Sequence, residues 1–404
     1  MIAGLVLLFG ALTFYEVTDR ADAASTVRDS SLQVSADAAE IYRSLADANT
    51  TAAVGFLAGA DEDEAVRAQY ESNIDNAAGL LASATAHGSQ SDEADEYIHI
   101  LARHLPEYTG LVETARANNR QGHPLGGAYL RHADQQMQET LLRAAEDLYA
   151  VETEWFRDDL AGARDRPWLA LTAGAVALAV LGWAQRRHFL RTNRVFNQGL
   201  LAATAAVVVL LAWLAGAHTL ARGALHEADR DAAQSLGVLH EAWIEALQAR
   251  GDESMTLVMR GAGSEFEDSH TEHMDRLAGE ENGALGEARA LAEDEAGRAP
   301  VEAAAEAAAE WSRRHAAARE SEQAGEYEEA VELVIGPEGS TGQSFTRVDA
   351  SLHEAVAYEQ AEFTAAADDG RDAFGGLPAG AVLLALLGAL GAVLGIGRRL
   401  SEYR

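Results

Sequence analysis

The sequence contains no cysteine and only six prolines among 404 residues, and all 31 of its basic residues are arginine. Without cysteine the chain can form neither a disulfide nor a cysteine-ligated zinc site, and it has no thiolate nucleophile. The 64 acidic residues give a formal net charge of −33. Abundant alanine, leucine and glutamate with so few prolines are typical of long helices. We therefore predict an all-α fold.

Motifs that mark common enzyme classes are also missing. There is no Walker loop, no glycine fingerprint for a nucleotide and no nucleophile motif. The excess of acidic charge argues against nucleic-acid binding, because contacts to phosphate require basic side chains. His270 and His273 stand three residues apart on a predicted helix and could chelate a divalent ion, but a solvated polar face is the simpler interpretation. We predict no enzyme activity, no cofactor and no metal site.

Four apolar runs have about the length that a bilayer core requires, roughly 20 residues at 1.5 Å per residue. The first is short and could be a signal-peptide core, but we favour a membrane helix with a truncated start. No ionisable residue lies in the core of these runs, which argues against a transporter. Their many small residues favour close packing between helices. The predicted spans are residues 1–15, 167–184, 196–217 and 374–396.

Arginines gather between and after the spans. The loop 185–195 has a net charge of +4 and the tail 397–404 of +2, whereas segments 16–166 and 218–373 carry −16 and −23. Positively charged short loops stay in the cytoplasm. We therefore predict a multi-pass protein of the cell membrane, with both termini and the loop inside and the two long segments outside. The arginines expected inside are Arg186, Arg187, Arg191, Arg194, Arg398 and Arg399. They could contact a cytoplasmic partner, or serve only topology and anionic lipid contact.

The two outer segments resemble each other at an offset near 200 residues. Residues 40–60 align with 241–263, Tyr108 with Trp311, Gly122 with Gly325 and 150–156 with 357–363. This similarity predicts a duplicated unit, in which a membrane helix, an outer bundle and a second membrane helix follow one another. We also predict a short insertion in the second copy around residues 335–344.

Inside each outer segment the apolar residues recur in helical steps of three and four. Glycine, asparagine and proline mark breaks at 58–63, 87–92 and 118–127. Each segment is therefore predicted to be an up-down-up-down four-helix bundle. We expect the bundle tips at Ala58–Glu64, Asn118–Gly127, Gly261–Glu267, Glu320–Tyr327 and 335–344. The predicted buried stripes are Ile41, Leu45, Ala48, Ala52 and Phe56 in the first helix, and Leu130, Ala133, Met137, Leu141, Ala144, Leu148, Val151 and Trp155 in the last.

The most distinctive polar stretch lies at the expected tip of the first bundle, in ARANNRQGHPLGGAYLR (115–131). Amide groups and an arginine fork suit carboxylate recognition. A docking surface for a partner is one interpretation, and a well-capped loop between helices is the other. The candidate partner-binding residues are Asn118, Asn119, Arg120, Gln121 and His123.

Four stretches resemble GlnX, an actinobacterial family of four-span membrane proteins: residues 41–59, 108–131, 191–204 and 397–404. The resemblance implies a circuit. An amino-acid-binding lipoprotein of the GlnH type senses aspartate or glutamate outside, and a serine/threonine kinase of the PknG type responds inside. We therefore expect a non-enzymatic transmembrane signal relay that contacts membrane lipid, and a homodimer is compatible with it. The alternative is a structural scaffold of an envelope complex that changes no state.

Overall fold

A computed structural model describes residues 1–26, 32–59, 62–87, 91–163, 166–192, 197–227, 234–260, 263–280 and 283–401. The elements in these ranges are helices, and the ranges contain no strand, so the predicted all-α fold is confirmed. The chain divides into two compact units. The span unit contains Met1–Ser30, Arg157–Asp229 and Thr364–Arg404, and the bundle unit contains Ser31–Phe156 and Arg230–Phe363.

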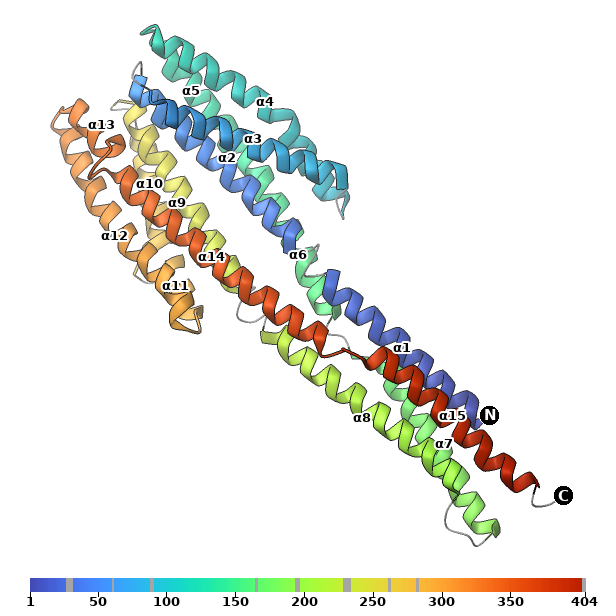
Figure 1. The fold of residues 1–404 in the computed structure, drawn as a ribbon. Coiled ribbons are helices and arrows are strands. Elements are labelled where there is room, and N and C mark those ends of the chain that lie inside the picture. Colours follow the sequence, from blue (N-terminus) through green and yellow to red (C-terminus); the bar gives the residue numbers. More distant parts are fainter. Residues whose placement is uncertain are drawn as a thin grey trace. The chain divides into compact units, whose positions relative to one another are not determined.

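Four long apolar helices form the span unit and lie side by side (Figure 1). Helix α1 contacts α7 and α15, and helix α8 contacts the same two helices. By length and composition all four could cross a membrane, which confirms the prediction of four spans and is compatible with a multi-pass membrane protein. The helices are α1 (Ile2–Thr26), α7 (Trp168–Thr192), α8 (Gln198–Glu227) and α15 (Leu377–Ser401).

Small residues bring these helices together. A Cβ atom at Gly199 of α8 would lie 2.2 Å from the Gly391 carbonyl oxygen of α15. A Cβ atom at Gly10 of α1 would lie 2.2 Å from the Ala385 Cβ of α15. Backbones can approach this closely only where the side chain is absent or small. The small residues noted in the sequence therefore define the contacts of α15 with both neighbours.

Helix α1 continues to Thr26, so the first candidate span, Ile2–Ala23, is longer than the predicted 1–15 and includes Glu16. The buried Glu16 carboxylate accepts hydrogen bonds from the backbone N–H groups of Leu169 (3.3 Å) and Ala170 (2.8 Å). These groups lie in the first turn of α7, where a helix leaves its amides without internal partners. Glu16 therefore caps α7, and this explains an acidic residue that the sequence did not predict within a span.

The bundle unit contains the two predicted helical copies, and the predicted breaks after Ala58, around 87–92 and around 118–127 are confirmed. The second copy is divided into more helices than expected, and Ser264–Glu267 begins a helix where the sequence predicted a tip loop. The first copy comprises α2 (Leu32–Ala58), α3 (Glu64–His87), α4 (Asp92–Arg120), α5 (Leu125–Gln136), the π-helical turn η3 (Met137–Leu142) and α6 (Arg143–Ala163). The second comprises α9 (Gln234–Val258), α10 (Ser264–Ala278), α11 (Ala284–Leu291), α12 (Glu295–Gln323), α13 (Tyr327–Ile335) and α14 (Thr341–Asp372).

Aligned positions of the two copies adopt the same local structure at the ends of α4 and α12. Gly122 follows α4 with φ +69°, and Gly325 follows α12 with φ +85°. Both lie in the left-handed region, which glycine enters without steric cost and which commonly ends helices. The matching conformations agree with the sequence alignment of these glycines, while duplication of the whole unit stays a prediction.

The predicted stripe of the last helix in the first copy is correct through Leu148 and wrong at its end. Trp155 is 40% exposed, and Phe156 is buried in its place. After Leu148 the buried face continues in steps of four residues to Glu152 and Phe156, whereas the prediction continued in steps of three and four to Val151 and Trp155. The Glu152 side chain therefore lies on the buried face of α6.

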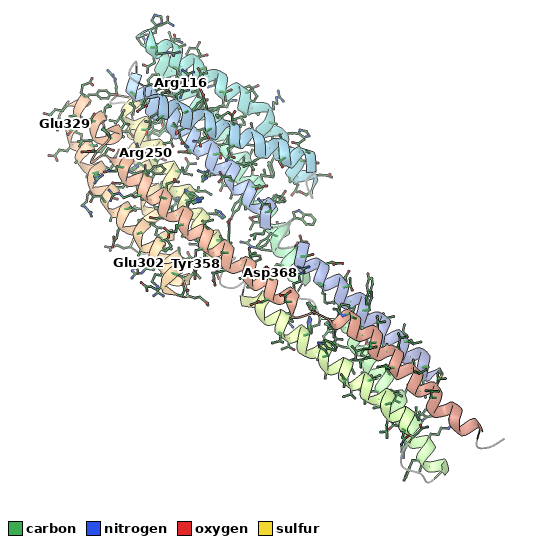
Figure 2. All side chains as sticks on the ribbon, in the orientation of Figure 1. Arg116, Arg250, Glu302, Glu329, Tyr358 and Asp368 are labelled. Atoms are coloured by element: carbon green, nitrogen blue, oxygen red, sulfur yellow. The ribbon has the colours of Figure 1, made fainter. Side chains whose placement is uncertain are left out.

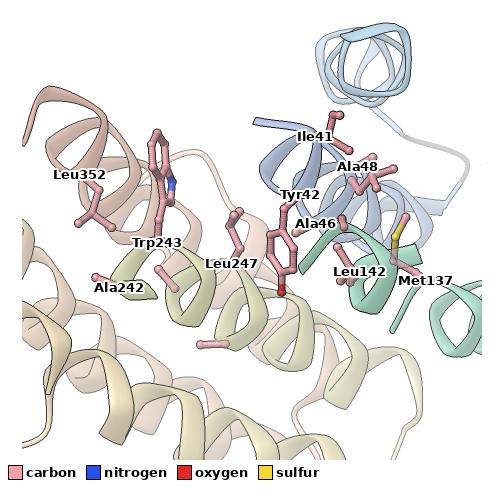
Figure 3. Close-up of a cluster of buried hydrophobic side chains, with 14 of the residues drawn as sticks. Ile41, Tyr42, Ala46, Ala48, Met137, Leu142, Ala242, Trp243, Leu247 and Leu352 are labelled. Carbon is pink, nitrogen blue, oxygen red and sulfur yellow. The ribbon is translucent and has the colours of Figure 1, made fainter. Parts of the chain in front are cut away.

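Both copies contribute to one hydrophobic core within the bundle unit. Helix α2 of the first copy packs against helix α9 of the second. Figure 3 shows Tyr42 of α2 beside Leu247 and Trp243 of α9 in this core. The Gln248 side-chain amide donates a hydrogen bond of 2.8 Å to the Tyr42 hydroxyl across the same contact. The α2–α9 seam is therefore the place where the two copies meet.

Candidate functional site

The predicted tip residues lie at the end of α4 and in the turn to α5. The Asn119 amide donates a hydrogen bond of 2.7 Å to the Phe56 carbonyl oxygen at the end of α2. The Asn118 and Gln121 amides donate to backbone oxygens one turn earlier in α4, at 2.8 and 3.1 Å. These bonds are those of a capped loop. Arg120, Gln121 and His123 have exposed side chains, so the surface offered to a partner consists mainly of these three residues.

The arginines predicted to face the cytoplasm belong to helices wherever the structure describes them. Arg186 and Arg187 have exposed side chains near the end of α7, and the Arg187 guanidinium lies 5.1 Å from the centre of the Trp183 ring. Arg191 is in the last turn of α7, so the predicted loop 185–195 is helical through residue 192. Arg398 and Arg399 lie in α15. The side chains of these last three residues, and the whole of Arg194, are outside the described part.

A buried ionic cluster in the second copy was not anticipated from the sequence. The Glu253 side chain is 1% exposed and pairs with Arg250. It also accepts hydrogen bonds from the Thr341 hydroxyl (2.9 Å) and the Trp311 indole N–H (3.1 Å), and it contacts His315 Nδ1 at 2.9 Å. Three helices, α9, α12 and α14, supply these side chains. Such a cluster stabilises a protein only when every buried charge has a partner, as here.

Charges within the cluster determine its protonation. Burial by itself raises the pKa of Glu253, but Arg250 and His315 lower it to about 2. Burial lowers the pKa of His315, but its hydrogen bonds to Glu253 and Glu267 raise it to about 9. Both side chains are therefore charged at neutral pH, and the ion pair persists there. The cluster is closed to solvent, so it orders the bundle and offers no reactive group.

The first copy places a smaller polar cluster at the aligned positions. The Asn49 amide donates a hydrogen bond of 2.8 Å to the Asp134 carboxylate, and the Tyr108 hydroxyl donates one of 3.3 Å to the Asn49 oxygen. Burial raises the pKa of Asp134 to about 6. In the alignment Asn49 corresponds to Arg250 and Tyr108 to Trp311. Figure 2 labels Arg250 together with Arg116, the buried arginine of the first copy, which pairs with Glu62 at 3.1 Å.

His270 and His273, considered as a chelating pair, point to different surroundings. The buried His270 contacts the Ala249 carbonyl oxygen at 2.8 Å and stacks on His315. His273 contacts Glu245 at 2.5 Å. Within the described ranges no group of three or more His, Asp or Glu side chains is arranged to hold a metal ion. The His270 imidazole instead packs α10 against α9 and α12, and the His273 imidazole contacts α9.

A cavity of about 240 Å³ opens at the α2–α9 seam. Helices α2, α6, α9 and α14 supply its walls, so the first and last helices of both copies meet there. Tyr42, Trp243 and Val356 form part of an apolar floor, and each is less than 10% exposed. A mostly apolar hollow with a few polar groups is the usual form of a small-molecule site. This seam pocket is therefore the main candidate for ligand binding in the bundle unit.

Residues 23–161 match the family model described as an actinobacterial sensor domain. The match supports an actinobacterial sensor-type protein. It includes the first bundle with Asn118–His123 and the pocket residues Tyr42 and Glu146, and it covers 139 of the 404 residues. Neither a curated protein nor a solved structure matches the chain. Together with four candidate spans, the sensor domain indicates a membrane protein with a sensing and signalling role.

The seam pocket was missed at the sequence level, although one signal pointed to it. The alignment that places residues 40–60 over 241–263 pairs Tyr42 with Trp243, so an aromatic residue recurs at one position of both copies. Both rings line the pocket. The pattern alone cannot show that these two faces pack on each other, because buried aromatic residues usually belong to the core of their own bundle.

Proposed function

We propose that the protein is a non-enzymatic transmembrane signal relay. The match of residues 23–161 to a sensor domain is the observation that carries this proposal. The four candidate spans support it, because they connect the bundles to a membrane. The resemblance to GlnX suggests the partners. An amino-acid-binding lipoprotein would dock outside, and a serine/threonine kinase would respond inside.

The docking surface on the outer side would be the tip of the first bundle. Arg120 and His123 are exposed there. The backbone that carries them is held in place by hydrogen bonds that the side-chain amides of Asn118 and Asn119 donate to backbone oxygens. A rigid turn with exposed polar side chains is suited to partner recognition. The exposed Arg186 and Arg187 of α7 would belong to the surface that the kinase reads.

Two helices provide a physical route between the units. The unit boundaries fall inside α6 and α14, at Phe156 and Phe363, so each helix belongs partly to both units. Shifts of about 1–2 Å in packed helices are a known way to transmit a state. The relay works only if the docked lipoprotein binds one arrangement of the helices more tightly than another.

A scaffold that holds an envelope complex is the second candidate, and the buried ionic cluster favours it. Every charge around Glu253 is paired, so the second bundle has little reason to rearrange. A scaffold would bind its partners with the same affinity whether or not a ligand is present.

The two functions can be separated with the full chain in lipid nanodiscs and an amino-acid-binding lipoprotein of the same host. We expect the dissociation constant to change at least tenfold when glutamate or aspartate is added, which is about 1.4 kcal/mol of coupling. Arg120→Ala should weaken docking, whereas the exposed Arg143→Ala on α6 serves as the matched control. Tight binding with the same dissociation constant in the presence and absence of the amino acid would establish a scaffold. Absence of binding would exclude this lipoprotein as the partner.

A further inference from the structure

The seam pocket lies where aligned faces of the two copies meet. Tyr42 and Trp243 occupy one aligned position, and the offset that pairs 150–156 with 357–363 also pairs Glu146 with His353. All four residues line the pocket. The two halves of the pocket are therefore related in position and different in charge, because all the lining carboxylates come from the first copy.

Carboxylates come from the first copy. Asp37 and Glu40 of α2 and Glu146 of α6 line this half, and Arg43 is the one basic residue among the lining side chains. Arg43 forms an ion pair with Glu40, so its charge is already balanced. Glu146 is exposed and forms no ion pair with any residue that the structure describes. This half of the pocket therefore has a net negative charge.

The second copy contributes the rings of Trp243, His240 and His353 to the pocket. The Trp243 indole N–H donates a hydrogen bond of 2.7 Å to Asp349, which holds the ring in place. His353 meets the Trp243 ring edge-on, with the ring centres 5.8 Å apart. The Arg43 guanidinium lies 5.6 Å from the centre of the same indole ring. A tryptophan face attracts cations within about 6 Å through its quadrupole, and Arg43 already makes such a contact with Trp243.

The His240 imidazole on the pocket wall adds no positive charge. His240 Nδ1 lies 3.1 Å from the Tyr149 hydroxyl. Burial lowers the pKa of His240 to about 4, so the ring is neutral at physiological pH. An anionic ligand would consequently face three carboxylates, and the groups that could attract it are Arg43, already paired with Glu40, and the His353 imidazole.

We propose that the seam pocket binds a small organic cation with an aromatic or apolar body. The ammonium group lies at the carboxylate wall, where Glu146 and Asp37 attract it, and the body rests on Trp243 and the apolar floor. Such a ligand joins the two copies, because its charge contacts the first and its ring contacts the second. It also touches α6 and α14, so binding there would bias the proposed relay, and this consequence alone rests on the proposed function.

Calorimetric titration of the full chain in zwitterionic nanodiscs tests the site with three probes of similar shape. The probes are 2-phenylethylamine, which is protonated at neutral pH, its uncharged isostere 2-phenylethanol, and the anion 3-phenylpropionate. Empty nanodiscs give the heat of partition into lipid. We expect saturable binding of the amine, at least tenfold tighter than the alcohol, which corresponds to about 1.4 kcal/mol. The anion should bind most weakly.

Two glutamates on α6 provide a matched pair of variants. Glu146→Gln should weaken binding of the amine about fivefold, because it removes one negative charge from the pocket wall. The affinity for the alcohol should not change. Glu154→Gln changes another exposed carboxylate of α6 that does not line the pocket, and it should have no effect. Trp243→Phe keeps an aromatic ring in the core and should weaken binding of both the amine and the alcohol.

Equal affinity for the amine and the alcohol would overturn the proposal, as would the absence of saturable binding. An equal loss of amine affinity in the Glu146 and Glu154 variants would overturn it too, because only general surface charge would then be at work. None of these titrations contains a lipoprotein, so they test the pocket independently of the relay.

Discussion

At the centre of the first bundle, an asparagine amide meets a single buried carboxyl group, whereas the second bundle places an ion pair at the aligned positions. Asn49 corresponds to Arg250, and Ala52 corresponds to Glu253. Position 52 needs no partner because alanine is apolar, but Glu253 requires both Arg250 and His315. The comparison shows that two helical bundles with aligned positions can have either a mostly apolar centre or an ionic one. The ionic centre is the less tolerant, since each charge depends on the others.

The largest expected effect follows from removing the charge at Glu253. Glu253→Gln leaves Arg250 and His315 buried without their counter-charge, so we expect a loss of at least about 3 kcal/mol in the free energy of unfolding of the second bundle. Hydrogen exchange of α9 and α12 amides in the full chain measures this loss locally. Protection of α2 and α4 in the first bundle should fall less.

Two further variants sharpen this test: a matched control, and a triple variant that introduces the first-copy residues into the second copy. Glu306→Gln changes an exposed glutamate of α12 and should alter protection by less than about 0.5 kcal/mol. The triple variant Glu253→Ala, Arg250→Asn, His315→Val carries the residues found at the aligned positions of the first copy. It should recover most of the loss, because the unpaired charges are gone. If the triple variant is less stable than the single one, the two centres are not equivalent.

A smaller effect of opposite sign is expected in the first bundle. Asp134 is an acid whose pKa is raised from 3.8 to about 6 by burial, so the folded state binds its proton more tightly than the unfolded chain does. Its contribution to stability is therefore greatest below pH 3.8 and falls as the pH rises through about 6. Asp134→Asn keeps an acceptor for the Asn49 amide and removes the buried charge. It should stabilise the first bundle by about 2 kcal/mol at pH 7.

Hydrogen exchange of α4 and α5 at pH 4.5 and pH 7 checks this prediction. The difference between Asp134→Asn and the unchanged chain should be large at pH 7 and small at pH 4.5. Helices α12 and α14 of the second bundle do not contain Asp134 and provide the internal reference. A destabilised variant at pH 7 would show that the Asp134 carboxylate has a stabilising partner.

The smallest effect concerns the N-terminal caps of α4 and α12, which occupy aligned positions. The Ser91 hydroxyl accepts the Ala94 N–H at 3.0 Å, and the Asp294 carboxylate accepts the Gly297 N–H at 2.8 Å. Ser91→Ala should cost about 1 kcal/mol, independent of pH. Asp294→Ala should cost more, because Asp294 also accepts the Tyr358 hydroxyl at 2.8 Å.

The Asp294 cap should also depend on pH. The Gly297 N–H and the Tyr358 hydroxyl hold the pKa of Asp294 below its ordinary value of 3.8. Its stabilising effect is therefore present above pH 3.8 and is lost as the pH falls further. Thermal unfolding of the Ser91 and Asp294 variants at pH 7 and pH 3 measures both effects, with Asp294→Asn as the control that keeps an acceptor. Equal pH dependence in the two variants would contradict this assignment.

Much of the fold could be predicted because it depends on composition along the chain. Apolar length identified the four spans, and glycine, asparagine and proline marked the ends of α2, α3 and α4. The end of the last stripe could not be predicted, because steps of three and of four residues both fit a helical face, and packing decides that Phe156 is buried instead of Trp155.

The candidate sites show the same division. The sequence located the exposed Arg120 and His123, because a polar Gly/Pro turn is a local signal. It missed the seam pocket and the Glu253 cluster. Both are assembled from helices that are far apart in the chain, as the 106 residues between Trp243 and its partner Asp349 illustrate.

The sequence by itself determined that this protein is helical and apolar enough in four places to span a membrane, because helix length, hydrophobicity and charge are properties of short segments. It also determined where several helices end, α2, α3 and α4 among them. Only the tertiary structure decided that α2 packs against α9, which residues line the pocket between them, and that Glu253 finds a counter-charge. Those outcomes depend on which faces meet, and a face acquires its partner only when the whole chain has packed.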